Sequence, residues 1–189
     1  MRGIASRSQL RMSYLRHALV TVPLVVLLGI LSGRLAGSGY GNPWFDALEK
    51  PAFMPPGWLF GIAWTILYIL LGLVLASILH ARGARGRGLV LGLFIAQLLL
   101  NYCWSPLFFA LHQTISALVV VLAMIGLSAA ATVLLWRVRK PAALLMLPYL
   151  AWLGFAAALT FEVARLNPEA AELVQGGSSS DIIDETGDH

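Results

Sequence analysis

Long apolar runs separated by short polar breaks form the dominant pattern of this chain. Crossing a bilayer as a helix takes about 20 mainly apolar residues. Five runs are long enough, and they cover residues 18–36, 58–79, 89–111, 117–136 and 142–163. The breaks between them are polar, charged or proline-bearing, as helix ends usually are. The pattern therefore predicts an all-α integral membrane protein built as a bundle of five transmembrane helices.

The composition excludes a soluble domain. Hydrophobic residues make up 59% of the 189 residues, charged residues only 12%, and the mean hydropathy is +0.80. Four arginines precede the first run, as in a signal peptide. However, the run is longer than the apolar region of a signal peptide, and Arg34 stands where a small-residue cleavage site is needed. We therefore expect this run to be retained as a helix.

The basic residues collect at alternate breaks. Ten of the thirteen Lys and Arg lie in the N-terminal segment 1–17 and in the breaks 80–88 and 137–141, whereas only Arg34, Lys50 and Arg165 fall on the other side. Lys and Arg close to span ends stay preferentially in the cytoplasm. We therefore expect a cytoplasmic N-terminus, an outer C-terminus and an outer position for the loop 37–57.

The formal charge of +4 is explained by this topology. The basic residues are split among three short segments with no aromatic residues between them, which indicates contact with anionic lipid headgroups and no nucleic-acid partner. Segment 168–189 differs, since it has six acids, no Lys or Arg, and a Gly-Gly-Ser-Ser-Ser stretch. That composition predicts a disordered acidic tail.

The reactive side chains show no catalytic or metal-binding pattern. Cys103 is the only cysteine and lies inside the third run, where we expect a buried small apolar side chain. The four histidines lie at run ends or in the termini, and none has a second ligand at metal spacing. We therefore assign no catalytic residue, no metal site and no required cofactor.

Three of the predicted helices carry an indole beside small or polar residues on one face. At 3.6 residues per turn, these faces consist of Gly61, Trp64, Tyr68 and Gly72 in the second run, Asn101, Trp104, Ser105 and Phe108 in the third, and Pro148, Trp152, Phe155, Ala156 and Leu159 in the fifth. Trp58 and Trp136 lie at run ends and fit an interfacial belt, whereas these three indoles lie deeper. Pro106 has no N–H, which frees the carbonyl of Tyr102.

Asn101 admits two interpretations, because an amide in hydrocarbon is costly unless it is bonded to a neighbouring helix or faces a cavity. In the first, it bonds a neighbouring helix. In the second, Asn101 and the inner indoles line a pocket for a flat, mostly apolar ligand, with the amide fixing its orientation. The loop before the second run is rich in Pro and Trp, which a simple connection between two helices does not need. We therefore expect this loop to fold over another part of the molecule.

Five ordered blocks follow one another along the chain. They are Trp44-Phe45-x-x-Leu48-x-Lys50-Pro51-x-Phe53-x-Pro55-Pro56-x-Trp58, Trp64-Thr65-x-Leu67-Tyr68, Asn101-x-x-Trp104-x-Pro106-x-Phe108-Phe109, Pro148-Tyr149-x-x-Trp152 and Leu159-x-Phe161-x-x-x-Arg165-Leu166-Asn167. Together they resemble the signature of the tryptophan-rich sensory protein (TspO/MBR) family, also called the translocator protein or peripheral-type benzodiazepine receptor family. The resemblance covers residues 18–167, the five-helix domain.

The resemblance implies a five-helix bundle, commonly a homodimer, whose first loop covers a cavity. The ligands it implies are porphyrins and heme-type tetrapyrroles, sterols, and isoquinoline or benzodiazepine compounds. Carried over by position, the pocket residues are Trp64, Asn101 and Trp152, surrounded by Phe45, Pro55, Tyr68, Phe108 and Ala156, with Trp104 added by the helical face. The lid residues are Trp44, Lys50, Pro51, Phe53, Pro56 and Trp58.

The chain also departs from the family pattern. Phe45 often has Tyr in its place, and Phe53 often has Trp, which weakens the expected hydrogen bonding by the lid. Leu159, Phe161 and Arg165 form a defective version of the sterol motif, because Phe161 replaces its Tyr. We therefore rank sterols below porphyrins.

Association has one clue in the sequence. Gly29, Gly33, Gly37 and Gly41 recur every four residues and make a strip where helices can approach closely. The strip serves either packing within the bundle or the seam of a homodimer.

Two classes of function remain open. The first is a receptor or transporter that binds tetrapyrroles and acts in their metabolism or in stress. The second is an enzyme that degrades porphyrin with light and oxygen, which the sequence favours less because it shows no general base or metal ligand set. A channel is disfavoured, because Glu162 is the only acid in the runs and is expected to pair with Arg165. The charge bias favours a bacterial inner membrane, whereas some family members reside in outer membranes.

Overall fold

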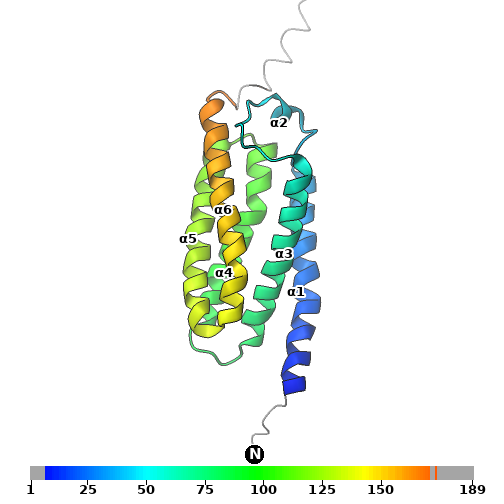
Figure 1. Ribbon diagram of the computed structural model, residues 1–189, viewed down its shortest axis with the longest axis vertical. Coiled ribbons are helices and arrows are strands. Elements are labelled where there is room, and N and C mark those ends of the chain that lie inside the picture. The colour runs from blue at the N-terminus through cyan, green and yellow to red at the C-terminus, as the bar shows by residue number, and fades with distance from the viewer. Residues whose placement is uncertain (1–6, 171–172, 174–189) are drawn as a thin grey trace, which may run out of the picture.

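Five long helices run along the long axis of the molecule in the computed structural model, which describes residues 7–170 and 173 (Figure 1). They are α1 (Arg7–Leu35), α3 (Gly57–His80), α4 (Arg87–Ser105), α5 (Thr114–Val138) and α6 (Lys140–Leu166). A short helix, α2 (Pro43–Ala47), lies in the first loop, and a π-helical turn, η1 (Pro106–Ala110), continues α4. Each of the five is long and apolar enough to cross a membrane. The predicted all-α membrane fold of five spans is confirmed.

The predicted runs match the helices except at the start of the first. Helix α1 begins at Arg7, well before the apolar run that begins at Ala18, so most of segment 1–17 is helical. A helix that has formed extends at little cost, and a rule based on apolar residues does not detect its basic first turns. The expected acidic tail lies, apart from residues 168–170 and 173, outside the described residues.

The helices form a closed ring in the order α1, α3, α6, α5, α4, with each packed against its neighbours. The half of the bundle near the α3–α4 and α5–α6 loops is filled by fully buried side chains such as Leu71, Ile78, Phe94 and Met146. Helix α1 approaches α3 closely there, since a Cβ on Gly72 would lie 2.6 Å from the Cα of Val22. The cavity described below lies at the opposite end, beneath the first loop.

Pro106 changes the course of α4. Because it has no N–H to donate to the carbonyl of Tyr102, that oxygen accepts a hydrogen bond from the hydroxyl of Ser32 on α1 instead. Beyond Pro106 the chain widens into a π turn, in which the N–H of Leu111 donates to the carbonyl of Pro106 at 3.0 Å. The Tyr102 carbonyl, which Pro106 leaves without its helical partner, therefore links α4 to α1 through a hydrogen bond.

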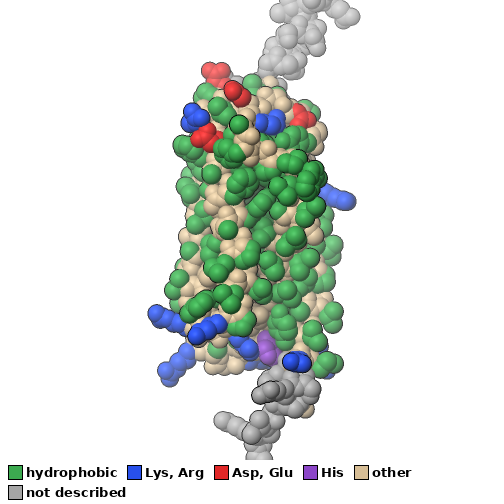
Figure 2. Space-filling view, viewed as in Figure 1, with side chains coloured by type: hydrophobic (Ala, Val, Ile, Leu, Met, Phe, Trp, Pro, Cys, Tyr) green, Lys and Arg blue, Asp and Glu red, His purple; other side chains and the backbone are tan. Residues whose placement is uncertain are grey.

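Charged side chains separate to the two ends of the bundle (Figure 2). The α3–α4 and α5–α6 loops carry basic side chains, whereas Asp46, Glu49, Glu162 and Glu169 lie at the end with α2. Glu162 pairs with Arg165 at 2.7 Å, as predicted. The surface between the ends is largely apolar (Figure 2). Cys103 is exposed on this surface, so the expectation of a buried thiol was wrong: the interior face of α4 is occupied by Asn101 and Trp104 instead.

Candidate functional site

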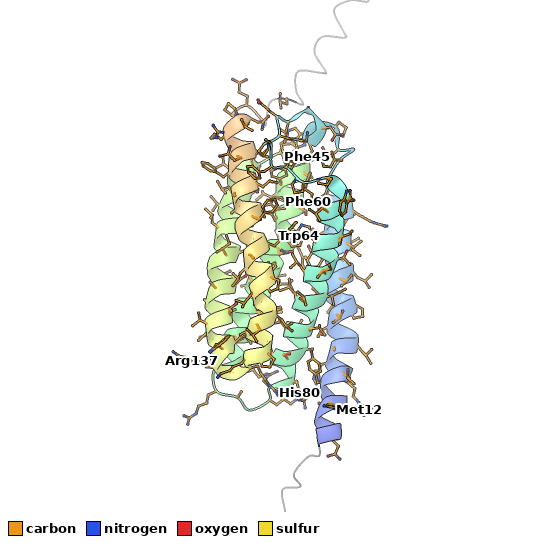
Figure 3. All side chains as sticks on the ribbon, in the orientation of Figure 1. Met12, Phe45, Phe60, Trp64, His80 and Arg137 are labelled. Carbon is orange, nitrogen blue, oxygen red and sulfur yellow. The ribbon has the colours of Figure 1, made fainter. Side chains whose placement is uncertain are left out.

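A cavity of about 360 Å³ lies among the five long helices, beneath the loop that holds α2. Its wall is mostly apolar and aromatic. Figure 3 shows Phe45, Phe60 and Trp64 one below another at this end of the molecule. Residues singled out in the sequence that line it include Phe45, Trp64, Tyr68, Asn101, Trp104, Phe108, Trp152, Ala156 and Leu159, together with Gly29, Gly33, Gly61, Thr65, Ser105 and Phe109.

The three inner indoles stand on different helices and all face this cavity. Trp64 stacks on Tyr68 with ring centroids 5.3 Å apart, and Trp152 meets Trp64 edge to face at 6.4 Å. Trp104 stacks on Phe108 at 5.0 Å, and its Nε1 donates to the carbonyl of Ala117 at 3.1 Å. The Nε1–H of Trp152 is buried without a hydrogen-bond partner among the described residues. The wall therefore offers flat π faces, and one unpaired donor is buried within it.

A chain of hydrogen bonds forms the polar part of the wall and continues behind it. The hydroxyl of Tyr68 donates to Oδ1 of Asn101 at 3.0 Å, and Nδ2 of Asn101 donates to the hydroxyl of Tyr149 at 3.1 Å. Tyr149 in turn donates to Oε1 of Gln97 at 2.7 Å. Both interpretations of Asn101 therefore hold. Its amide bonds side chains of the neighbouring helices α3 and α6, and it also lines the cavity.

Helix α2 gives the loop its shape. Asn42 caps the helix by accepting from the N–H of Phe45 at 3.1 Å, and Pro43 occupies the first turn. This places Trp44 and Phe45 inward, where both are buried. The Nζ of Lys50 lies 4.9 Å from the centroid of the Phe45 ring, which holds Phe45 in the roof of the cavity through a cation–π contact.

The loop is tied to the end of α6. The indole Nε1 of Trp44 donates to the carbonyl of Ala170 at 2.6 Å. Asn167 makes two further bonds: its Nδ2 donates to the carbonyl of Glu49 at 2.9 Å, and its Oδ1 accepts from the N–H of Glu49 at 2.8 Å. We call this set of three bonds the lid clasp.

Several residues singled out in the sequence lie away from the cavity wall. The structure places Trp44, Lys50, Pro51, Phe53, Pro55, Pro56 and Trp58 around the roof or outside it, and Phe161 and Arg165 on the outer face of α6. Phe53 is half exposed beside Phe155, and Trp58 is 66% exposed. Residues 159 and 161 point to opposite sides of a helix because two residues turn it by about 200°. Leu159 and Phe161 therefore cannot both face one ligand in this cavity.

Sequence reasoning missed part of the site. Phe60, Tyr40 and Met124 line the cavity without having been singled out. Gln97 had a visible signal, because it lies one helical turn before Asn101, and a second amide on that face indicates a polar network. Tyr40 had none, since its position depends on the fold of the loop.

Comparisons with known proteins place the chain among relatives. The model of the TspO/MBR family matches residues 20–166. The chain belongs to the TspO/MBR family. Its relatives include the tryptophan-rich protein TspO of Archaeoglobus fulgidus, 40% identical over 75% of this chain and 94% of that protein. Protein CrtK of Rhodobacter capsulatus is 41% identical over 66% and 79%, and human translocator protein is 39% identical over 74% and 84%.

The family membership agrees with the fold. The matched residues include parts of all five membrane helices, α1 from residue 20 onward, and the loop with α2. The resemblance in the five sequence blocks is therefore confirmed, and TspO/MBR membership supports a membrane receptor or transporter role.

Proposed function

We propose that this TspO/MBR protein is a membrane receptor or transporter that binds porphyrins or related tetrapyrroles in the aromatic cavity and acts in their metabolism or in stress. The observation that carries the proposal is the cavity itself, in which indoles from three helices surround one space beneath a loop. Ligand sites of proteins are mostly apolar, with a few placed polar groups, and have volumes of about 300–1,000 Å³. The cavity has this character.

The shape of the wall supports a flat ligand. Trp64 with Tyr68 and Trp104 with Phe108 present stacked rings, and planar ring systems stack on such faces. Sterols rank lower, because Phe161 and Arg165 of the sterol-like motif lie outside the wall.

A second candidate is an enzyme that degrades bound porphyrin with light and oxygen. The edge-to-face contact of Trp64 and Trp152 favours it, since two indoles in contact beside a bound porphyrin are suited to serve as redox partners. The two functions share one binding site and differ in the fate of the bound porphyrin under illumination.

One titration separates the candidates. Protoporphyrin IX is added to the purified protein in lipid nanodiscs while Trp fluorescence and the porphyrin absorbance are followed, and the complex is then illuminated in air. We expect saturable binding that weakens by up to about fivefold in Trp64→Phe or Trp152→Phe, because the smaller ring keeps only part of an aromatic contact that contributes on the order of 1 kcal/mol. Trp136→Phe is the control, since Trp136 is exposed and lies outside the wall.

The outcomes are distinct. Saturable binding with the same photobleaching as free porphyrin supports the receptor or transporter. A defined product that forms in the wild-type and Trp136→Phe proteins, but not in the two cavity variants, supports the enzyme. Absence of saturable binding by the wild-type protein rejects both.

A further inference from the structure

One face of α3 is turned toward α1 along the whole length of the pair. Gly61, Thr65, Tyr68 and Gly72 share this face at helical spacing. Gly72 is in close contact with Val22 of α1, and Tyr68 packs on Gly29, where a Cβ would lie 2.2 Å from the ring. The deeper half of the seam between α1 and α3 is therefore closed.

The same face is open nearer the lid. Gly61 and Thr65 are exposed, although they continue the face that is buried at Tyr68 and Gly72. A Cβ on Gly61 would meet no described atom within 4 Å, and one on Gly33 of α1 would meet only Ser38, at 3.9 Å. All three of Gly33, Gly61 and Thr65 also line the cavity. Exposed residues that also belong to the cavity wall indicate a gap between α1 and α3 above Tyr68 that opens to the outer surface.

The gap lies at the depth of lipid. Trp58 is exposed at the start of α3, where indoles mark the membrane interface. Gly61 and Thr65 follow about 5 and 10 Å deeper, at 1.5 Å per residue. Ile30, which lines the cavity, is 42% exposed, and Ile62 and Ile66 on α3 are 51% and 53% exposed. The surroundings are apolar, and the hydroxyl of Thr65 is satisfied by the carbonyl of Gly61 at 2.7 Å.

We propose that this gap is a lateral portal through which the ligand passes between the lid-side leaflet of the bilayer and the cavity. The inference rests on the proposed function, and it adds that the ligand is taken from the membrane rather than from water. The route through the loop is the alternative. That route requires the lid clasp to break at Trp44 and Asn167, whereas the gap is already lined by glycines and apolar side chains.

Blocking the portal should change the rates of ligand association and dissociation more than the equilibrium affinity, because the ligand passes through the portal in both directions. Protoporphyrin IX is supplied in donor vesicles to the protein in nanodiscs, and binding and release are followed by stopped-flow Trp quenching. We expect Gly61→Leu to slow association and dissociation alike by about tenfold, as when binding requires a conformational change. The matched control is Gly154→Leu, an exposed glycine on α6 whose Cβ would also meet no described atom within 4 Å.

A second variant tests the portal in a single protein. In Thr65→Cys with Cys103→Ser, the only thiol stands beside the gap, and a bulky maleimide is attached either before or after loading with porphyrin. We expect attachment beforehand to slow loading and attachment afterwards to slow release. Because the same folded protein is compared with and without the label, a folding defect cannot imitate the result.

Three results overturn the portal. The first is unchanged rates in Gly61→Leu and in the labelled protein, together with normal equilibrium binding. The second is loss of equilibrium binding in Gly61→Leu, which assigns Gly61 to the binding wall. The third is equal slowing in Gly154→Leu. A wild-type protein that shows no saturable binding rejects the proposed function, and the portal with it.

Discussion

Gly29 fixes the place of Tyr68 and, through it, of Asn101. A Cβ at Gly29 would lie 2.2–2.6 Å from three carbons of the Tyr68 ring, and the hydroxyl of that ring donates to Asn101 at 3.0 Å. The absence of a side chain on α1 therefore allows a hydrogen bond between α3 and α4. This is a packing role, and it does not require the backbone freedom of glycine.

Gly29→Ala is expected to destabilise the protein and weaken ligand binding together. Overpacking of this kind lowers the free energy of unfolding by about 1–3 kcal/mol. Because Tyr68 lines the cavity, displacing its ring also changes the cavity wall. Gly154→Ala is the control, because it adds the same methyl group in open space and a helical alanine is favoured over glycine by about 0.5–1 kcal/mol. Equilibrium unfolding in detergent and porphyrin titration measure the two effects. Equal stabilities of the two variants would contradict this account of Gly29.

Sequence reasoning at the residue scale succeeded where a helical face alone determines a position. Trp64, Trp104 and Trp152 were separated from the interfacial Trp58 by depth and face, and all three line the cavity. It failed for Cys103, because membership of an apolar run does not say which side of the helix meets lipid. Whether the cavity residues bind a ligand stays a prediction.

At the scale of elements, the lid clasp decides how the first loop is held. Asn167, just past the end of α6, bonds both backbone groups of Glu49. Each bond contributes about 0.5–1.5 kcal/mol, so the pair holds the loop through an element more than a hundred residues away in sequence.

Asn167→Ala is expected to make the loop 37–57 easier to open. Losing the two bonds to Glu49 lowers the free energy of local opening by more than about 1 kcal/mol. The rate of proteolytic cleavage, which follows the population of the open loop, should then rise roughly tenfold. Chymotrypsin is a suitable probe, since Tyr40 and Phe53 are each about half exposed. The control is Glu169→Ala, an exposed position in the same segment. Equal cleavage rates in the two variants would show that the clasp does not hold the loop.

The elements themselves were largely readable from the sequence. Apolar runs predicted the five long helices because the bilayer sets their length. Helix α2 was missed, although Asn42 followed by Pro43 is a helix-start signal, because five residues carry too little periodicity to be noticed. The lid clasp was not predictable, since the pairing of Glu49 with Asn167 depends on the tertiary fold.

At the scale of the whole molecule, the glycine strip on α1 is better explained by packing within one bundle than by a dimer seam. Gly29 packs on Tyr68, Gly33 lines the cavity, and Gly37 and Gly41 lie in the loop with φ of +61° and +93°. The strip is therefore used inside a single chain. A homodimer stays a proposal, with its seam on another surface.

The separation of charge along the bundle predicts how the molecule sits in the membrane. The described basic side chains at the end with the α3–α4 and α5–α6 loops are Arg11, Arg16, Arg82, Arg85, Arg87, Arg137, Arg139 and Lys140, and the described acids lie at the other end. Because basic residues near span ends are retained in the cytoplasm, we propose that the lid and the portal face outward. Fractionation of the producing cells distinguishes a bacterial inner membrane from an outer one.

Two single-cysteine proteins test this orientation without altering the charge bias. In a Cys103→Ser background, Ala47→Cys places a thiol on α2, and Gly88→Cys places one at the start of α4, where a Cβ meets no described atom within 4 Å. Both positions are exposed. In intact spheroplasts, a membrane-impermeant maleimide is expected to label Ala47→Cys at once and Gly88→Cys only after lysis, because the membrane shields the basic end. Labelling in the reverse order would place the lid in the cytoplasm, and the ligand would then be taken from the inner leaflet.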